Sequence, residues 1–342
     1  MSPTLPHQLM RLTRGVPGAG PTAQAIAVYA EPPTSAAGLP NTPVAAREQG
    51  FEGVACVDDA ARAVVLYCAI WRRWRLMSAR SAAEGLLHFL AHMQDEEGRF
   101  CNFILDWTGR KNCSGPTSYA GGTPWQARGL HALACGVAAF AGGEWEQRFT
   151  RALRWIDPPM AYLDVRAVAV LAVLEHWRAS GSASSAERAL AWSSEIARHT
   201  SRGQLLNAEG VQPIHLWGHL QEAALANVGR ELSRTDLVDC AATSAASLLL
   251  PAVDDGFSAA HVVPFDVSCT IAGLAAVARA TGETRYAEAA ERGREWFRGR
   301  NTASQPVHDV RLGLIYDGID DGRVSRNSGA ESNIEGALAL LN

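Results

Sequence analysis

The chain has 342 residues, of which 47% are hydrophobic and 19% charged, and its formal net charge is -4. This composition predicts a globular protein with a sizeable core, and the scattered Lys and Arg residues argue against a nucleic-acid partner. No apolar run of about 18 residues is evident, so we expect no membrane partner. The first 20 residues are rich in Pro and Gly and lack the apolar core of a signal peptide.

Apolar residues recur with helical spacing along most of the chain, in segments rich in Ala, Leu, Glu and Arg. Strand patterns are limited to short ribbons at Val54–Val57, Ala259–Val263 and Leu312–Tyr316. The predicted helices, in chain order, are 6–13, 59–75, 81–94, 124–141, 144–156, 161–179, 184–200, 216–232, 234–249, 267–281, 284–300 and 331–341.

Tight turns alternate with long connections between these helices. The tight turns include Ser180–Ala183 and Thr281–Glu283, and the long connections include 95–123 and 301–330. Because short turns lie at one end of an array of helical hairpins, the long loops gather at the other end. Six such hairpins can close on themselves, so we predict an all-α (α/α)6 barrel as a single domain over residues 1–342. An open right-handed solenoid is the alternative.

Seven cysteines are spread along the chain. Cys101 and Cys113 flank a loop and could pair, but unpaired thiols are the favoured interpretation for them too. No Cys-x-x-Cys pair is present, which argues against a zinc site. Together these features predict a reducing, cytoplasmic location. The remaining cysteines lie among apolar residues and are predicted to be buried free thiols: Cys56, Cys68, Cys135, Cys240 and Cys269.

Acidic residues open helices near both ends of the chain. Asp58 and Asp59 begin the helix predicted at 59–75, and Glu331 begins the last helix. If the ring closes, these carboxylates meet at one mouth, and two facing carboxylates are the minimum equipment for cleaving a glycosidic bond. Asp266, which also lies at a helix start, is a further catalytic candidate.

Aromatic, amide and charged residues are predicted to gather at the same mouth. Aromatic faces pack on the apolar faces of sugar rings, and polar groups bind the hydroxyls. No metal and no cofactor is expected, since the His215–His219 pair lacks the Glu of a zinc-protease helix. The predicted substrate-binding residues are Asn102, Trp107, Trp125, Arg128, Trp217, His219, Tyr316 and Asn327.

Each acidic motif also has a purely structural interpretation. Asp58 or Asp59 could cap a helix and pair with Arg62 in its first turn. Ser328 and Glu331 have the spacing of a capping box. Two adjacent aspartates nevertheless exceed what one cap requires.

Five short motifs occur in order along the chain. In these motifs and their order, the chain resembles a bacterial family of six-hairpin, glycosidase-like proteins, often fused to or encoded beside sugar-nucleotide glycosyltransferases. The motifs are Val57-Asp58-Asp59-Ala60-Ala61-Arg62-Ala63, Gly98-Arg99-Phe100-Cys101-Asn102-Phe103, Ala127-Arg128-Gly129-Leu130-His131, Val263-Pro264-Phe265-Asp266 and Asn327-Ser328-Gly329-Ala330-Glu331-Ser332.

The resemblance implies an (α/α)6 toroid with a carbohydrate-active or carbohydrate-binding role in carbohydrate metabolism. It marks Asp58, Asp59, Asp266 and Glu331 as the acidic positions to test. Three departures stand out. Ala60 replaces the family's Asn, Ala120–Thr123 occupies the place of an acidic pair, and Asp266 stands where the family has Glu.

The leading hypothesis is a glycoside hydrolase that acts on an oligosaccharide or glycoconjugate. We expect Glu331 and either Asp59 or Asp58 to act by inversion, with Asp266 in reserve. The main alternative is a non-catalytic saccharide-binding or scaffolding module that serves a glycosyltransferase, which the missing acidic pair favours. A terpene cyclase is a third alternative, but the Asp58-Asp59 motif lacks the further aspartate that a magnesium site would want.

Overall fold

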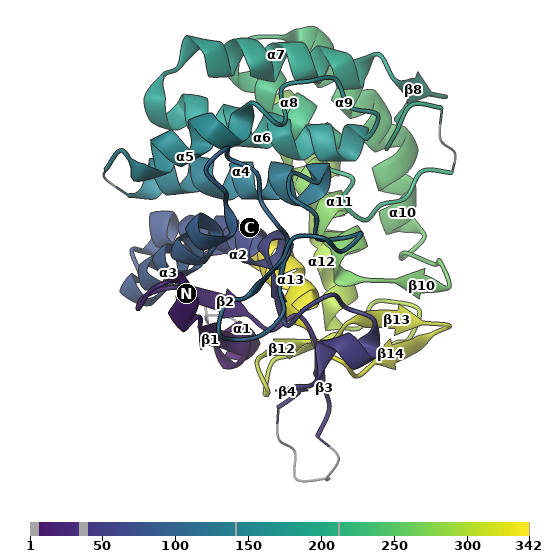
Figure 1. The fold of residues 1–342 in the computed structure, drawn as a ribbon. Helices are drawn as coiled ribbons and strands as arrows, with labels where there is room; N and C mark the ends of the chain where they lie inside the picture. Colours follow the sequence, from purple (N-terminus) through teal and green to yellow (C-terminus); the bar gives the residue numbers. More distant parts are fainter. Residues whose placement is uncertain (1–6, 34–39, 141, 211–212, 342) are drawn as a thin grey trace.

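The computed structural model describes residues 7–33, 40–140, 142–210 and 213–341, and these residues are mostly helical (Figure 1). All twelve predicted helices are present in these ranges, with ends shifted by a few residues; position 141 and residue 6 lie outside them. The helices are α1 His7–Leu12, α2 Val57–Trp74, α3 Met77–Met93, α4 Thr123–Ala139, α5 Glu144–Leu153, α6 Leu163–Ser180, α7 Ala183–Ala197, α8 Gln221–Glu231, α9 Thr235–Ser244, α10 Leu250–Asp254, α11 Pro264–Thr281, α12 Thr284–Glu295 and α13 Ala330–Leu341.

Six of these helices form a closed inner ring. Helix α2 contacts α4, α4 contacts α6, α6 contacts α8, α8 contacts α11, α11 contacts α13, and α13 returns to α2. In Figure 1 the last helix, α13, lies beside α2 near the middle of the molecule. This closure confirms the (α/α)6 barrel and rules out the open solenoid.

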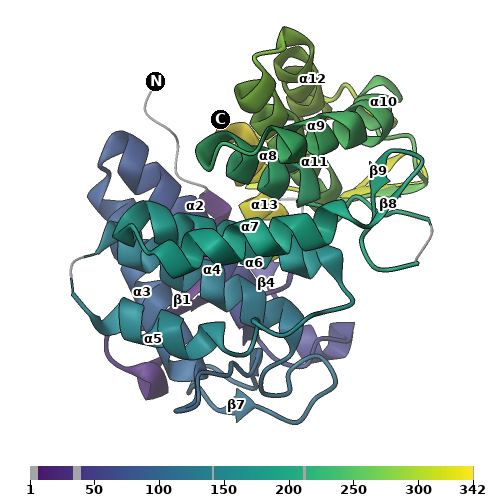
Figure 2. The same ribbon diagram turned by 90° about the horizontal axis from the view of Figure 1, so that it is seen from above.

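The other helices form an outer layer. Helices α3, α5, α7, α9 and α12 each pack on the inner helix that precedes them, as α7 does outside α6 in Figures 1 and 2. The N-terminal helix α1 contacts α13. The sixth pair of helices therefore consists of α13 in the inner ring and α1 outside it. The prediction of one domain over residues 1–342 stays a prediction, since its two ends lie outside the described ranges.

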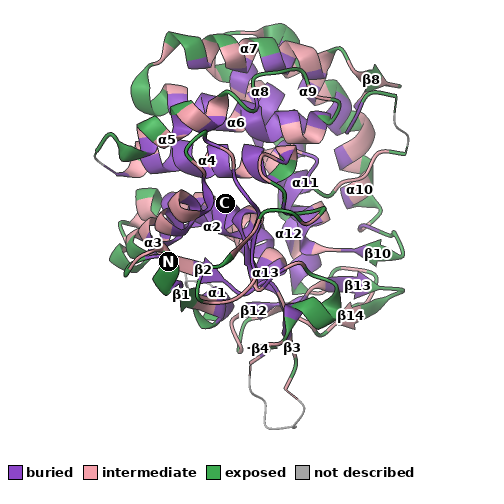
Figure 3. Ribbon diagram, viewed as in Figure 1, coloured by how far each residue is buried: buried purple, intermediate pink, exposed green. Residues whose placement is uncertain are grey.

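Residue type decides which helices lie inside. Inner helices are covered on all sides, so they are rich in small and apolar residues around their whole circumference, as in α6 and α11. Figure 3 shows this difference: buried residues dominate α4, α6 and α11, whereas α7 carries exposed residues outward. In α4, Gly129 lies against Phe100, and a Cβ added there would lie 2.6 Å from the ring. Small residues therefore let the loops pack tightly on the inner ring.

Short antiparallel strands occur only in the connections of the described ranges. The three predicted ribbons are confirmed at β5, β10 and β12. The strands are β1 Thr13–Gly15, β2 Gln24–Ile26, β3 Ala30–Glu31, β4 Thr42–Pro43, β5 Ala55–Cys56, β6 Phe103–Ile104, β7 Lys111–Asn112, β8 Thr200–Ser201, β9 Gln204–Leu205, β10 His261–Val262, β11 His308–Asp309, β12 Leu314–Ile315, β13 Gly318–Asp320 and β14 Arg323–Ser325. The two larger sheets have the strand orders β5-β6-β7 and β10-β13-β14.

The cysteines bring one correction. Cys101 and Cys113 form a disulfide that closes the β6–β7 hairpin, so the favoured interpretation as unpaired thiols was wrong for this pair. The other five cysteines are free, and four of them are buried. Disulfides are rare in reducing compartments, so a cytoplasmic location loses this support and stays a prediction.

One outer segment differs from the expectation about apolar runs. Helix α9 continues through a π-helical turn, Ala245–Leu249, into α10. This stretch, Thr235–Asp254, is long and apolar enough to cross a membrane by length and composition, and 33% of it is buried. It packs on α8 and α11 as an outer helix, and a core helix of a globular protein passes the same test.

Candidate functional site

The inner helices begin at the face where the long connections enter. Among these fully described helices, five of six carry an acidic residue in the first turn, and only α4 has none. The positive end of each helix dipole favours such carboxylates. The barrel mouth is therefore strongly acidic. The residues are Asp58 and Asp59 on α2, Asp164 on α6, Glu222 on α8, Asp266 on α11 and Glu331 on α13.

A pocket of about 170 Å³ lies inside the ring, with walls from α2, α4, α6, α11 and α13. Most of its lining is apolar, including Val65, Leu171, Phe265, Ile271 and Leu338. Its polar residues are Arg62, Arg128, His131, Ser268 and Glu335.

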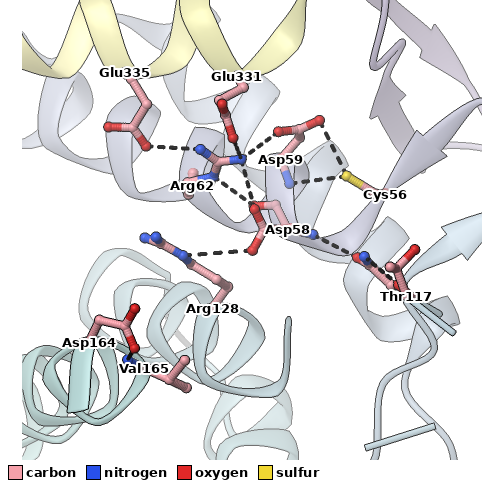
Figure 4. Close-up of polar contacts among 11 residues, drawn as sticks. Cys56, Asp58, Asp59, Arg62, Thr117, Arg128, Asp164, Val165, Glu331 and Glu335 are labelled. Atoms are coloured by element: carbon pink, nitrogen blue, oxygen red, sulfur yellow. Dashed lines mark hydrogen bonds and ion pairs between the residues drawn. The ribbon is translucent and has the colours of Figure 1, made fainter. Parts of the chain in front are cut away.

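Arg62 joins this pocket to the acidic mouth (Figure 4). Its Nη2 lies 2.7 Å from Asp58, 2.8 Å from Asp59 and 3.1 Å from Glu331, and its Nη1 lies 3.1 Å from Glu335. The Arg62 side chain is only 3% exposed, whereas those of Asp58 and Glu331 are 28% and 47% exposed. Carboxylates from opposite ends of the chain thus meet at one cation beside the pocket.

Four carboxylates around one guanidinium leave the cluster with excess negative charge. Burial raises the pKa of Asp59 to about 7, against the attraction of Arg62 and with added repulsion from Asp58 and Glu331. Burial also raises the pKa of Glu335. The cluster therefore retains protons at a pH where most carboxyls have lost theirs.

The capping interpretation of the aspartates is wrong for α2. The N-cap of this helix is Cys56, whose Sγ accepts the backbone N–H of Asp59 at 3.4 Å. The Ser328 hydroxyl, expected to cap the last helix, donates instead to the carbonyl of Ile315. Asp266 does act as a cap: its Oδ2 accepts the backbone N–H of Val263 at 2.8 Å.

Asp266 nevertheless lies within electrostatic reach of the cluster. Burial raises the pKa of Asp266, and the charge of Glu331 raises it further, against the Val263 hydrogen bond and two histidines. Three carboxylates, those of Asp58, Asp59 and Glu331, bring one oxygen each within 4.8 Å of one another. A metal ion could occupy this set only in competition with the Arg62 guanidinium, which all three already contact.

Arg128 is the one residue of the predicted substrate-binding set that lines the pocket. Its side chain is 13% exposed, its Nε lies 3.7 Å from Asp58, and its guanidinium lies 5.3 Å from the centre of the Phe265 ring. It supplies a second positive charge at the edge of the acidic cluster.

Asn102 lies beside the acidic cluster, and its side chain bonds to the backbone rather than lining the pocket. Its Oδ1 accepts the backbone N–H of Asp58, and its Nδ2 donates to the carbonyl of Thr117. The two indoles predicted near it lie outside the pocket. Trp125 is buried and donates from Nε1 to the carbonyl of Phe100, and Trp107 lies under the guanidinium of Arg14 in the first hairpin.

Three other predicted residues are committed to internal contacts. His219 is buried and bonds to Asn207 and Glu222. Tyr316 is buried beneath the Arg326 guanidinium, and Asn327 donates to the hydroxyl of Tyr29.

Trp217, the last of the set, is 53% exposed and stacks on His215 with ring centres 4.0 Å apart. It therefore presents its other face to solvent.

Sequence reasoning missed four polar residues of the pocket: Arg62, Glu335, His131 and Ser268. A signal existed for Glu335, because it follows Glu331 by four residues and so shares its helix face. Burial lowers the pKa of His131 to about 4, so its imidazole is neutral at pH 7.

No family model matches the chain, and no curated protein matches it. Solved structures do match. A cellobiose 2-epimerase from Bacillus thermoamylovorans is 14% identical with a TM-score of 0.64, over 84% of this chain and 87% of that one. A D-mannose isomerase is 11% identical with a TM-score of 0.65, over 84% and 87% of the two chains.

A GH76 α-mannanase from Bacteroides thetaiotaomicron is 9% identical with a TM-score of 0.62, over 85% of this chain and 86% of that one. These identities are low, and the likeness extends over nearly the whole length of each partner. Together with the closed ring of helices, they establish that this chain has the (α/α)6 toroid fold.

Proposed function

We propose that this chain is a carbohydrate-active enzyme that cleaves a glycosidic bond at the mouth of the barrel pocket. The single observation behind this proposal is that carboxylates of α2 and α13 converge on Arg62 at the edge of an axial pocket. The named neighbours of the same fold, which include two sugar isomerising enzymes and a mannanase, support a sugar as substrate.

Glu335 is the best candidate for the general acid. It lines the pocket, and burial raises its pKa, as a proton donor requires at neutral pH. Glu331 lies one helical turn earlier on α13, about 6 Å away along the axis, and reaches solvent beside Arg62. It is the candidate nucleophile or base.

Asp58 and Arg128 would then bind sugar hydroxyls. Asp59 is buried against Cys56 and Arg62, which suits a residue that positions Arg62 rather than one that touches substrate. Asp266 stays a reserve candidate for the second carboxylate.

The spacing changes the expected stereochemistry. Inverting enzymes hold their carboxyls about 6.5–9.5 Å apart to admit a water, and retaining enzymes about 5–5.5 Å. The oxygens of Asp58, Asp59 and Glu331 lie within 4.8 Å of one another, which is too close for the inverting arrangement predicted for these pairs. Inversion by Glu331 with Asp58 or Asp59 is therefore no longer proposed, and the Glu331–Glu335 pair carries no stereochemical expectation.

The test is turnover of a panel of oligosaccharides by wild-type protein and by Glu335→Gln and Glu331→Gln. Each substitution is expected to reduce kcat by roughly 10²–10⁴-fold. The control is Glu288→Gln, which makes the same change on the exposed face of α12 and should leave turnover unchanged. Turnover within a few-fold of wild type in both pocket variants would reject these roles. Saccharide binding without any turnover would instead favour the binding or scaffolding module, for which a glycosyltransferase partner remains a proposal.

A second candidate function, sugar epimerisation or isomerisation, is favoured by His131. Its neutral imidazole lies in the pocket wall, where it could accept a proton from a carbon next to a carbonyl, although burial makes it a weaker base than a free imidazole. In ordinary water this reaction would leave the mass of the sugar unchanged, in heavy water it would place deuterium on a sugar carbon, and His131→Asn would abolish it. Hydrolysis changes the mass and places no deuterium on carbon.

A further inference from the structure

Three large aromatic side chains remain exposed where neighbouring inner helices begin. Tyr119 lies shortly before α4 and is 49% exposed, Tyr162 directly precedes α6 and is 58% exposed, and Trp217 lies shortly before α8 and is 53% exposed. Helices α4, α6 and α8 are consecutive in the inner ring. The three aromatics therefore follow one side of the barrel mouth.

The exposed Trp217 ring is fixed in place, and the backbone of Tyr162 is fixed close to it. Trp217 stacks on His215 at an interplanar angle of 11°, and the backbone N–H of His215 donates to Oδ1 of Asn207. The backbone of Tyr162 pairs with Ala208, next to that same Asn207. Such fixed platforms lose little conformational entropy when a ligand packs on them.

Tyr119 is held in a similar way. Its ring meets Trp125 edge-on at 5.0 Å, and its carbonyl accepts the Nε1–H of Trp125 at 3.2 Å. Its neighbour Thr117 is bonded to Asn102, which in turn accepts the backbone N–H of Asp58. Hydrogen bonds through Asn102 thus link the loop that carries Tyr119 to the backbone of Asp58.

Charged groups lie at the same mouth of the barrel. In Figure 4, Arg128 lies between Asp58 and Asp164, and Thr117 lies beyond Asp58. Asp164 lies two residues beyond Tyr162 and 3.8 Å from Nε2 of His215. Aromatic faces alternating with carboxylates are suited to sugar rings, whose C–H faces are apolar and whose hydroxyls donate hydrogen bonds.

We propose that Tyr119, Tyr162 and Trp217 form a binding row for a neutral oligosaccharide chain whose end enters the pocket. The proposal rests on the proposed function for its site and names the substrate class. The pocket, at about 170 Å³, is small beside the roughly 300–1,000 Å³ of sites for drug-sized ligands, so only the end of a chain would fit. The acidic residues of the mouth repel acidic polysaccharides, which leaves uncharged chains as the occupant.

The test is calorimetric binding of cello-, manno- and malto-oligosaccharides of increasing length, with oligogalacturonates as the acidic comparison. Wild-type protein is expected to bind one neutral series more tightly as the chain lengthens and to bind the acidic series weakly. Trp217→Ala and Tyr162→Ala should bind the longer chains about tenfold more weakly while binding of the shortest chain is unchanged. The control is Met77→Ala, an exposed apolar residue at the opposite end of the barrel.

Three results would overturn the binding row: no neutral series bound, tighter binding of the acidic series, or the same length dependence in the variants and the wild type. Because binding needs no turnover, this measurement is independent of the catalytic test. Length-dependent binding that the variants lose, without any turnover, would support the row and reject the hydrolase. Turnover without length dependence would do the reverse.

Discussion

Two polar clusters are built into this barrel at opposite ends. At the mouth, Arg62 contacts four carboxylates beside a pocket. At the other end, His176 of α6 lies between Ser185, whose Oγ is 2.8 Å from Nδ1, and Glu146, whose carboxylate is 2.9 Å from Nε2. The His176 ring also stacks on Phe149 at 4.1 Å.

The two clusters differ in how well their groups are matched. In the His176 cluster each ring nitrogen has a close partner. Buried polar groups that are paired in this way do not destabilise the fold. In the Arg62 cluster several acids share one cation, and burial raises the pKa of Asp59 and Glu335. Unmatched charge costs stability and is common at functional sites. The difference supports the proposal that the chemistry takes place at the mouth, and we interpret the His176 cluster as structural.

The largest expected effect comes from removing the cation of the mouth cluster. Arg62→Met leaves buried carboxylates without a partner, so the free energy of unfolding should fall by about 3–5 kcal/mol, measured by urea denaturation. The control is Arg188→Met, which removes a partly exposed ion pair with Asp157 and should cost less than about 1 kcal/mol. Equal losses in the two variants would mean that the Arg62 cluster is no more than a surface ion pair.

A smaller effect concerns the pH dependence of the same cluster. The pKa of Asp59 is about 7 in the folded protein and near 3.8 when unfolded, so between these values the folded state holds a proton that unfolding releases. Stability from this group is complete below about pH 4 and is lost as the pH rises through about 7.

Relative to Asp59→Asn, the wild type should therefore lose on the order of 2 kcal/mol of unfolding free energy between pH 5 and pH 8. Urea denaturation of both proteins at the two pH values measures this difference. If the stability of the wild type relative to the variant does not change over this range, Asp59 is ionised throughout.

The fold was predictable because its signals are local. Apolar spacing within each segment placed the helices, and the alternation of short and long connections implied the ring. The meeting of Asp58 with Glu331 followed from that ring, because both residues begin inner helices. The centre of the site was harder to predict. In the sequence, Arg62 looks like an ion-pair partner within α2, and only the closed ring brings α13 next to it.

Burial of single side chains depends on distant contacts and escaped prediction. Trp125 and Tyr316 look like sugar platforms in sequence, yet loop residues cover them. The disulfide also escaped prediction, because Cys101 meets Cys113 only through the pairing of β6 with β7. Tyr162 and Trp217 stayed exposed for the corresponding reason that no loop of the described ranges covers them.

The smallest expected effect tests the other side of the comparison. Ser185→Ala removes the partner of Nδ1 in the buried His176 ring and should lower the free energy of unfolding by roughly 1–3 kcal/mol, towards the low end of that range if Ser180, 3.4 Å from the same nitrogen, takes over. Turnover of the substrate found for the wild type should not change, because this cluster lies at the far end of α6 from the pocket mouth. Urea denaturation and initial rates on the same preparation measure both quantities. A variant with wild-type stability and much reduced turnover would reverse the assignment and move chemistry to the matched cluster.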